Sequence, residues 1–103
     1  HRVGQDDLAV RLFLHAISLR PYEFGAFCRI GLLYLDQHKF EDAQHNLALA
    51  VERDPTFGWG WYWLGEARRA SGDMAGACQA YQRAGEKGET DANKLGNELC
   101  KKN

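Results

Sequence analysis

Residues 27–34 read FCRIGLLY, and residues 61–68, which lie 34 positions further on, read WYWLGEAR. Three pairs of similar residues coincide when the two stretches are aligned: Phe27 with Trp61, Ile30 with Leu64, and Gly31 with Gly65. Positions spaced in this way, at i, i+3 and i+4, lie on one face of an α-helix, and we expect this face to form the core of its hairpin. A glycine inside a helix costs about 1 kcal/mol against alanine. Its recurrence therefore indicates a close helix contact that only glycine permits.

The same 34-residue period continues in a stripe of small and large residues that follows each stretch. The stripe consists of Ala43, Leu47 and Ala50 in one copy, Ala77, Tyr81 and Ala84 in the next, and Ala9, Phe13 and Ala16 in an earlier one. Small side chains at two of three positions let two helices approach closely, while a large one fills the remaining space. The chain is therefore predicted to repeat a unit of two packed helices.

This pattern resembles the tetratricopeptide repeat, whose signature is W-x2-L-G-x2-Y, then A-x3-F, then Pro. The middle copy has Tyr34 at the last position of the first motif and Pro55 at the end. The third copy departs from the signature, because it has Arg68 in place of the tyrosine and Glu89 in place of the proline. The resemblance implies an all-α fold, a right-handed α-α superhelix (solenoid) of helical hairpins.

Six helices are expected, at about 6–19, 24–37, 40–52, 58–70, 74–86 and 91–101. They would form one tetratricopeptide domain over residues 1–103. Its parts are the second half of a repeat at 4–23, full repeats at 24–57 and 58–91, and a C-terminal helix at 92–103. The last helix either begins a further repeat or covers the end of the array.

The composition argues against two classes of partner. The chain has 103 residues, of which 45% are hydrophobic and 26% charged, and its formal net charge is −1. A chain of this charge lacks the basic surface that nucleic-acid binding needs. No apolar run approaches the roughly 18 residues that span a bilayer. The sequence therefore predicts neither a nucleic-acid partner nor a membrane partner.

The three cysteines are odd in number and widely spaced: Cys28, Cys78 and Cys100. This is unlike a disulfide framework or a zinc knuckle, so reduced thiols in the cytoplasm are the favoured expectation. One disulfide with one free thiol is the alternative. No histidine pair has the spacing of metal ligands. We therefore expect no catalytic residue, no metal and no cofactor, and we do not expect an enzyme.

In the family, the first helix of each hairpin lines a concave groove, and helical phase indicates which residues face it. On helix 24–37 these are Cys28, Leu32 and Leu35, and on helix 58–70 they are Trp59, Tyr62, Glu66 and Arg69, with Trp63 beside them. Leucines and aromatic rings on such a face predict a groove that takes apolar side chains of a peptide or helix. Glu66, Arg69 and Arg29 would orient its polar groups. The alternative is packing, in which the aromatic rings fill a gap between hairpins.

The resemblance implies a protein–protein interaction module, a scaffold, adaptor or chaperone-like protein whose partner has apolar anchors. Some family members capture a C-terminal carboxylate with Lys and Asn residues at the places held here by Cys28, Leu32 and Tyr62. That mode is therefore not expected. A non-catalytic region of a larger enzyme is an alternative.

Helix 6–19 would lack the first helix of its own repeat. Four apolar side chains on it would then be left uncovered: Leu8, Leu12, Phe13 and Ile17. A bare solenoid end exposes an apolar patch. Either the chain is a fragment of a longer array, or a second copy covers this surface through self-association.

Overall fold

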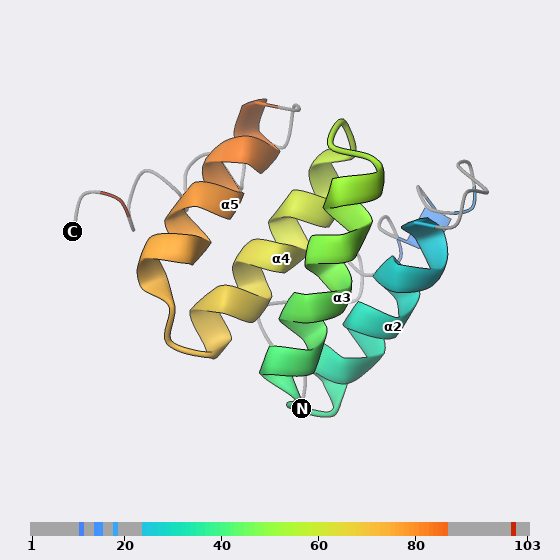
Figure 1. Cartoon of the computed structure of the whole chain (residues 1–103), viewed down its shortest axis with the longest axis horizontal. Helices are drawn as coiled ribbons and strands as arrows, with labels where there is room; N and C mark the ends of the chain where they lie inside the picture. The colour runs from blue at the N-terminus through green and yellow to red at the C-terminus, as the bar shows by residue number, and fades with distance from the viewer. Residues whose placement is uncertain (1–10, 12–13, 16–17, 19–23, 87–99, 101–103) are drawn as a thin grey trace.

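A computed structural model describes residues 24–86 together with residues 11, 14, 15, 18 and 100. Its four complete helices are α2 (Phe24–Asp36), α3 (Phe40–Arg53), α4 (Gly58–Ala70) and α5 (Met74–Glu86), and the described residues include no strand (Figure 1). These bounds agree with the expected ones to within one residue, and the all-α fold is confirmed. The expected helices at 6–19 and 91–101 lie outside the described residues, except for residues 11, 14, 15, 18 and 100, which are helical.

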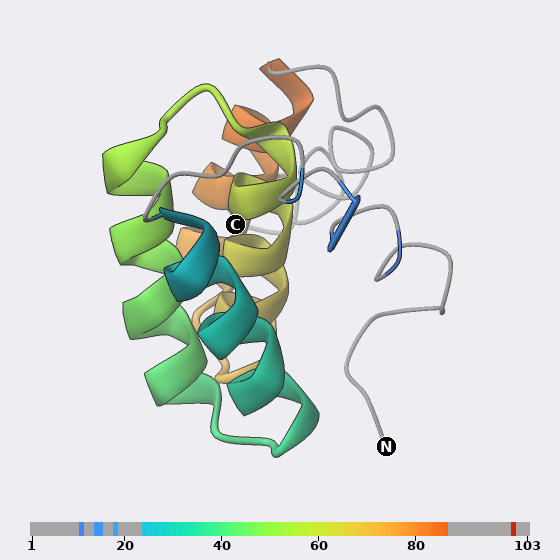
Figure 2. The same cartoon turned by 90° about the vertical axis from the view of Figure 1, so that its right-hand side faces the viewer.

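The helices pack in chain order, α2 against α3, α3 against α4, and α4 against α5. Figure 1 shows the four side by side, and Figure 2 shows α3 on one side of α2 and α4. Two hairpins, α2–α3 and α4–α5, are therefore stacked through the α3–α4 contact, as expected of a helical repeat. Among the described helices, none is both long and apolar enough to cross a membrane.

Both hairpins turn in the same way. His38 has a φ of 62° and Gly72, which lies 34 residues later, has a φ of 95°. After each of them a backbone N–H reaches back to the helix, from Lys39 to the Tyr34 carbonyl and from Asp73 to the Arg68 carbonyl, at 2.8 Å in both cases. This is the Schellman arrangement, in which a left-handed residue ends the helix.

The recurring glycines make the close contact that the sequence predicts. A Cβ added at Gly31 would lie 2.6 Å from Cγ of Leu47, so the leucine packs directly on the backbone of α2. Gly65 has the same relation to Tyr81 on α5. In each hairpin the large residue of the second helix therefore sits on the glycine of the first.

One predicted core residue is exposed. Leu64 is 1% exposed, whereas Ile30, its equivalent on α2, is 41% exposed, and Leu33 beside it is 55% exposed. The difference arises because α4 is covered by α3 of the preceding hairpin. Val51 of α3 reaches Gly60, where an added Cβ would lie 3.1 Å from the valine Cγ1. The assignment of Ile30 to the hairpin core is therefore wrong.

The cysteines do not have the state that the sequence favours. Cys78 on α5 and Cys100 form a disulfide, with their Cα atoms 5.4 Å apart, and Cys28 is free and buried. The expectation of three reduced thiols is wrong, and the alternative of one pair with one free thiol holds. The spacing of the cysteines does not indicate this disulfide, because the fold brings together two cysteines that are 22 residues apart. Disulfides persist mainly in oxidising compartments, so the cysteines no longer support the predicted cytoplasmic location, which stays a prediction.

Candidate functional site

The predicted groove residues of α2 and α4 divide into a buried set and a partly exposed set. The buried side chains are Cys28, Leu35, Trp63 and Glu66, none more than 2% exposed. Those half-buried are Leu32, Trp59, Tyr62 and Arg69, and Arg29 is exposed. The prediction that Cys28, Leu35 and Trp63 line an accessible groove is wrong, because these apolar side chains are buried. Glu66 is buried too, so it can contact a partner only after the side chains around it move. We call the half-buried set, Leu32, Trp59, Tyr62 and Arg69, the groove rim.

The buried apolar members belong to the core that joins the two hairpins. Cys28, Leu35 and Trp63 lie in one cluster with the alanines and Leu47 of α3, and Leu14 packs against the same cluster. The packing interpretation is therefore right for Trp63. Helical phase identified which residues share a face, but it carried no information about what covers that face.

The aromatic residues of the groove rim are arranged around Tyr62. Its ring meets Trp59 at a centroid distance of 5.4 Å and an interplanar angle of 80°, and it meets Trp63 at 5.1 Å and 87°. Both are edge-to-face contacts, the arrangement that the ring quadrupoles favour. The ring centroids of Tyr62 and of Tyr81 on α5 are 6.0 Å apart. The rim is thus an ordered aromatic surface with Trp63 and Tyr81 beneath it.

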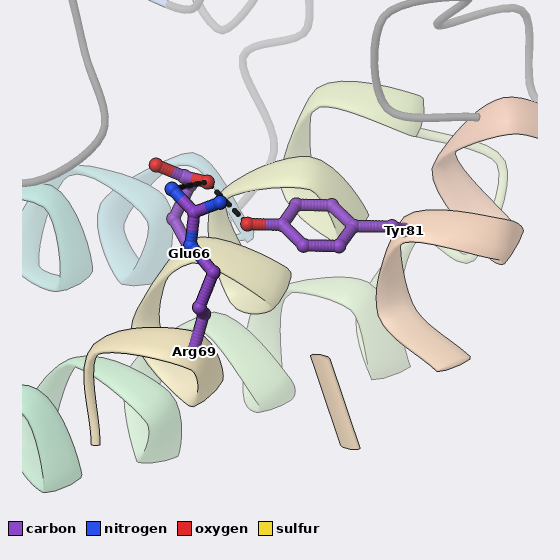
Figure 3. Close-up of polar contacts among 3 residues, drawn as sticks. All are labelled: Glu66, Arg69 and Tyr81. Carbon is purple, nitrogen blue, oxygen red and sulfur yellow. Dashed lines mark hydrogen bonds and ion pairs between the residues drawn. The ribbon is translucent and has the colours of Figure 1, made fainter. Parts of the chain in front are cut away.

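A buried polar group stands next to these rings (Figure 3). Glu66 of α4 accepts a hydrogen bond from the Tyr81 hydroxyl at Oε1, and the same oxygen lies 3.4 Å from Nη2 of Arg69. Burial raises the pKa of Glu66, while the Tyr81 hydrogen bond and the Arg69 charge partly oppose the rise. The pKa of Tyr81 is also raised, by burial first and then by the charge of Glu66 and the hydrogen bond to it. The three side chains form one coupled group.

Comparison with known proteins agrees with this architecture. A family model described as tetratricopeptide repeat matches residues 28–92. The chain belongs to the tetratricopeptide repeat family. Over 61 residues it is 46% identical to the TPR repeat-containing protein PA0015 of Pseudomonas aeruginosa, and the match covers 57% of this chain. The chain spans only 58% of the length of that relative.

Within this tetratricopeptide array, the third repeat replaces an apolar pair by a polar one. Leu32 and Leu47 of the second repeat correspond to Glu66 and Tyr81 of the third. The repeat spacing predicts Tyr81 in the core stripe but does not indicate that its hydroxyl pairs with Glu66. The simultaneous change of both positions is the signal that could have found it.

Arg68, which departs from the tetratricopeptide signature, also has a structural role. Its Nη1 donates to the carbonyl of Gly76 on α5 at 3.1 Å. At the start of that helix, the Gly76 N–H donates to Oδ1 of Asp73 at 2.9 Å, which caps the helix. The arginine therefore ties α4 to the first turn of α5 in the third repeat.

A separate cleft of about 380 Å³ lies between α4 and α5 and contains no residue of the groove rim. It is lined by Trp61, Arg68, Gln79, Gln82, Arg83 and Glu86. Arg83 stacks on Trp61, with its Cζ 5.4 Å from the ring centroid, and Arg68 is held by Gly76. Because its cations already have partners within the protein, this cleft is a weaker candidate than the groove rim.

No catalytic arrangement is evident in the part of the chain that the structure describes. Cys28 is fully buried, and burial together with the nearby Asp54 charge raises the pKa of its thiol to about 12. A thiol of this kind is a poor nucleophile, because the thiolate is the reactive form. Across the described residues, no three His, Cys, Asp or Glu side chains gather as a metal site would require.

Proposed function

We propose that this chain is an interaction module, a scaffold, adaptor or chaperone-like unit, that binds a peptide or helix of another protein at the groove rim. Tetratricopeptide proteins are generally non-catalytic scaffolds that bind other proteins. The observation that supports the rim as the binding surface is that Trp59 and Tyr62 stay half-exposed although they belong to an ordered aromatic cluster. Tryptophan and tyrosine are enriched among the residues that contribute most to binding at protein interfaces.

The rest of the groove rim fits a partner with apolar anchors. Leu32 adds apolar area on α2, and Arg69 stands at the far end of the stripe on α4 with its side chain 33% exposed. Arg29, exposed on α2, supplies a second charged group. The proposal assigns this chain itself no catalytic step.

Peptide selection tests the proposal. Peptides enriched from a random dodecapeptide library on the immobilised chain should bind it in calorimetry. Tyr62→Ala and Leu32→Asp should each abolish this binding, because they remove an anchor or place a charge among apolar groups. His45→Ala, an exposed change on α3, is the matched control and should leave the affinity unchanged. Circular dichroism of each variant should show retained helicity. Undiminished binding by both rim variants would remove the rim from consideration.

A second candidate function is assembly through the open face of α2. Ala26, Ile30 and Leu33 are exposed there, whereas their equivalents on α4, Gly60, Leu64 and Ala67, are buried. An apolar helix face that its own repeat leaves open is suited to another helix of the same kind. The predicted self-association residues, Leu8, Leu12, Phe13 and Ile17, lie outside the described residues.

Light scattering at several concentrations tests assembly. If a second copy covers the open face, the mass should rise above that of one chain, and Ile30→Asp with Leu33→Asp should restore the single-chain mass. A strict monomer at all concentrations would exclude this function.

A further inference from the structure

Glu66 has one carboxylate oxygen that is used within the protein and one that is not. Oε1 accepts the Tyr81 hydroxyl and faces Arg69, whereas Oε2 is buried and has no hydrogen-bond partner in the described part of the chain. Figure 3 shows one oxygen directed at Tyr81 and the other pointing away from it. A buried acceptor without a donor carries an uncompensated desolvation cost, and the cost is larger for a carboxylate. A donor supplied from outside would remove that cost.

The side chains next to Glu66 on the same helix face are aromatic. Trp59 and Tyr62 precede it by seven and four residues, so the three stand on successive turns of α4. The two rings meet edge to face and both are half-buried. The faces of such rings attract an ammonium or guanidinium group. The carboxylate and the rings thus favour the same kind of ligand, a cation with N–H donors.

On the basis of the proposed function, we propose that Glu66, Tyr62 and Trp59 form a subsite for a lysine or arginine side chain of the bound segment. The cation donates to Oε2 of Glu66 after the side chains that bury this oxygen move aside, and its alkyl stem lies against the rings. The partner therefore carries a basic residue in addition to its apolar anchors.

Arg69 does not already fill this subsite. It pairs with Oε1 at 3.4 Å and its guanidinium lies 6.0 Å from the Tyr81 ring, while Oε2 has no hydrogen-bond partner in the described part of the chain. Arg69 therefore balances the charge of the carboxylate without satisfying its hydrogen-bonding capacity.

The preceding repeat has no equivalent of the subsite. Cys28 and Leu32 stand on α2 at the places of Tyr62 and Glu66, so this side of the groove is apolar. Adjacent packed helices lie about 8–10 Å apart, and an extended chain advances about 3.3 Å per residue. An extended partner would therefore place its basic residue about three positions from an apolar one.

The test uses dodecapeptides selected from a random library on the oxidised wild-type chain and, in parallel, on Glu66→Gln. Selection on the wild type should enrich Lys or Arg about three residues from an apolar residue, and selection on Glu66→Gln should enrich only the apolar residue. In the tightest wild-type peptide, exchange of the basic residue for norleucine should weaken binding roughly tenfold to a hundredfold. The same exchange should change binding to Glu66→Gln less than twofold.

The controls separate the possible failures. Tyr81→Phe keeps the carboxylate and should keep the dependence on the basic residue. The norleucine exchange on the wild-type protein needs no variant to fold, so it decides the question by itself. Equal affinity of the lysine and norleucine peptides, or enrichment of acidic peptides, would overturn the subsite but leave the groove intact. If no enriched peptide binds the Leu32→Asp variant more weakly than the wild type, the proposed function itself is overturned.

Discussion

The ring of Tyr81 packs directly on the backbone of Gly65, so that a Cβ added at residue 65 would lie 2.8 Å from the ring atoms Cδ1 and Cε1. The ring is fully buried and its hydroxyl is held by Glu66, so it has little freedom to move. Gly65→Ala should therefore lower the free energy of unfolding by about 1–3 kcal/mol. This loss should appear although alanine is the better helix former. Urea unfolding followed by circular dichroism measures it.

Gly31→Ala is the matched variant in the preceding repeat, where the added Cβ would lie 2.6 Å from Cγ of the buried Leu47. It should also destabilise the fold. An alanine variant at residue 65 that is as stable as the wild type would show that this contact is not tight.

The repeat and its glycine contacts could be predicted because they depend on short-range periodicity. Gly31 and Gly65 recur at the same place in two helices, and such recurrence shows which residue must be small. The exposure of Ile30 could not be predicted in the same way. It depends on what stands beside α2, whereas Leu64 at the same position of the repeat is covered by α3.

The two hairpin turns offer a second prediction, about backbone strain. Gly72 has a φ of 95°, and nothing lies within 4 Å of a Cβ built there. Gly72→Ala should therefore cost about 1 kcal/mol through the left-handed conformation alone. At the equivalent turn, His38→Gly should be more stable than His38→Ala by a similar amount, because both lose the ring contact with Phe40 and only glycine relieves the strain. Thermal unfolding of the three variants gives the comparison, and equal stability of the two residue-38 variants would contradict the argument.

The buried carboxylate gives the stability a dependence on pH. Burial raises the pKa of Glu66 in the folded state above its usual value of 4.5. Between that value and the folded pKa, the folded state holds a proton that the unfolded state has lost, so the free energy of unfolding falls as pH rises. The glutamine side chain of Glu66→Gln does not titrate. The stability of the wild type relative to the variant should therefore decline from pH 4.5 upward. Urea unfolding at pH 4, 5.5 and 7 tests this, and parallel curves for the two proteins would contradict it.

Cys28 should be protected from thiol reagents in the folded state. Burial raises the pKa of its thiol to about 12, so very little thiolate is present at pH 8, and its side chain is fully buried. Iodoacetamide should therefore label the native, oxidised chain very slowly and should modify one thiol once urea unfolds it. Mass spectrometry counts the modified thiols, and Cys28→Ala should stay unlabelled under both conditions. Rapid native labelling at Cys28 would show that the α2–α4 contact opens readily.

The candidate site was only partly readable from the sequence. Helical phase predicts that Trp59 and Tyr62 lie on the groove face of their helix, and both reach the surface. It also placed Trp63 and Glu66 there, and both are buried, because a stripe identifies neighbours along one helix but not the side chains that arrive from another. The partnership of Glu66 with Tyr81 joins two helices, so only the paired change between repeats points to it.

The disulfide gives the unfolding of this array a direction. Units of a repeat protein contact only their neighbours, so such chains unravel from their ends. At one end, the disulfide bond of Cys78 links α5 to Cys100, which lies 22 residues further along the chain. At the other end of the described helices, α2 presents an open apolar face and its free Cys28 has no covalent tie. The α2–α3 hairpin lacks such a tie, so its amide hydrogens should exchange before those of the α4–α5 hairpin.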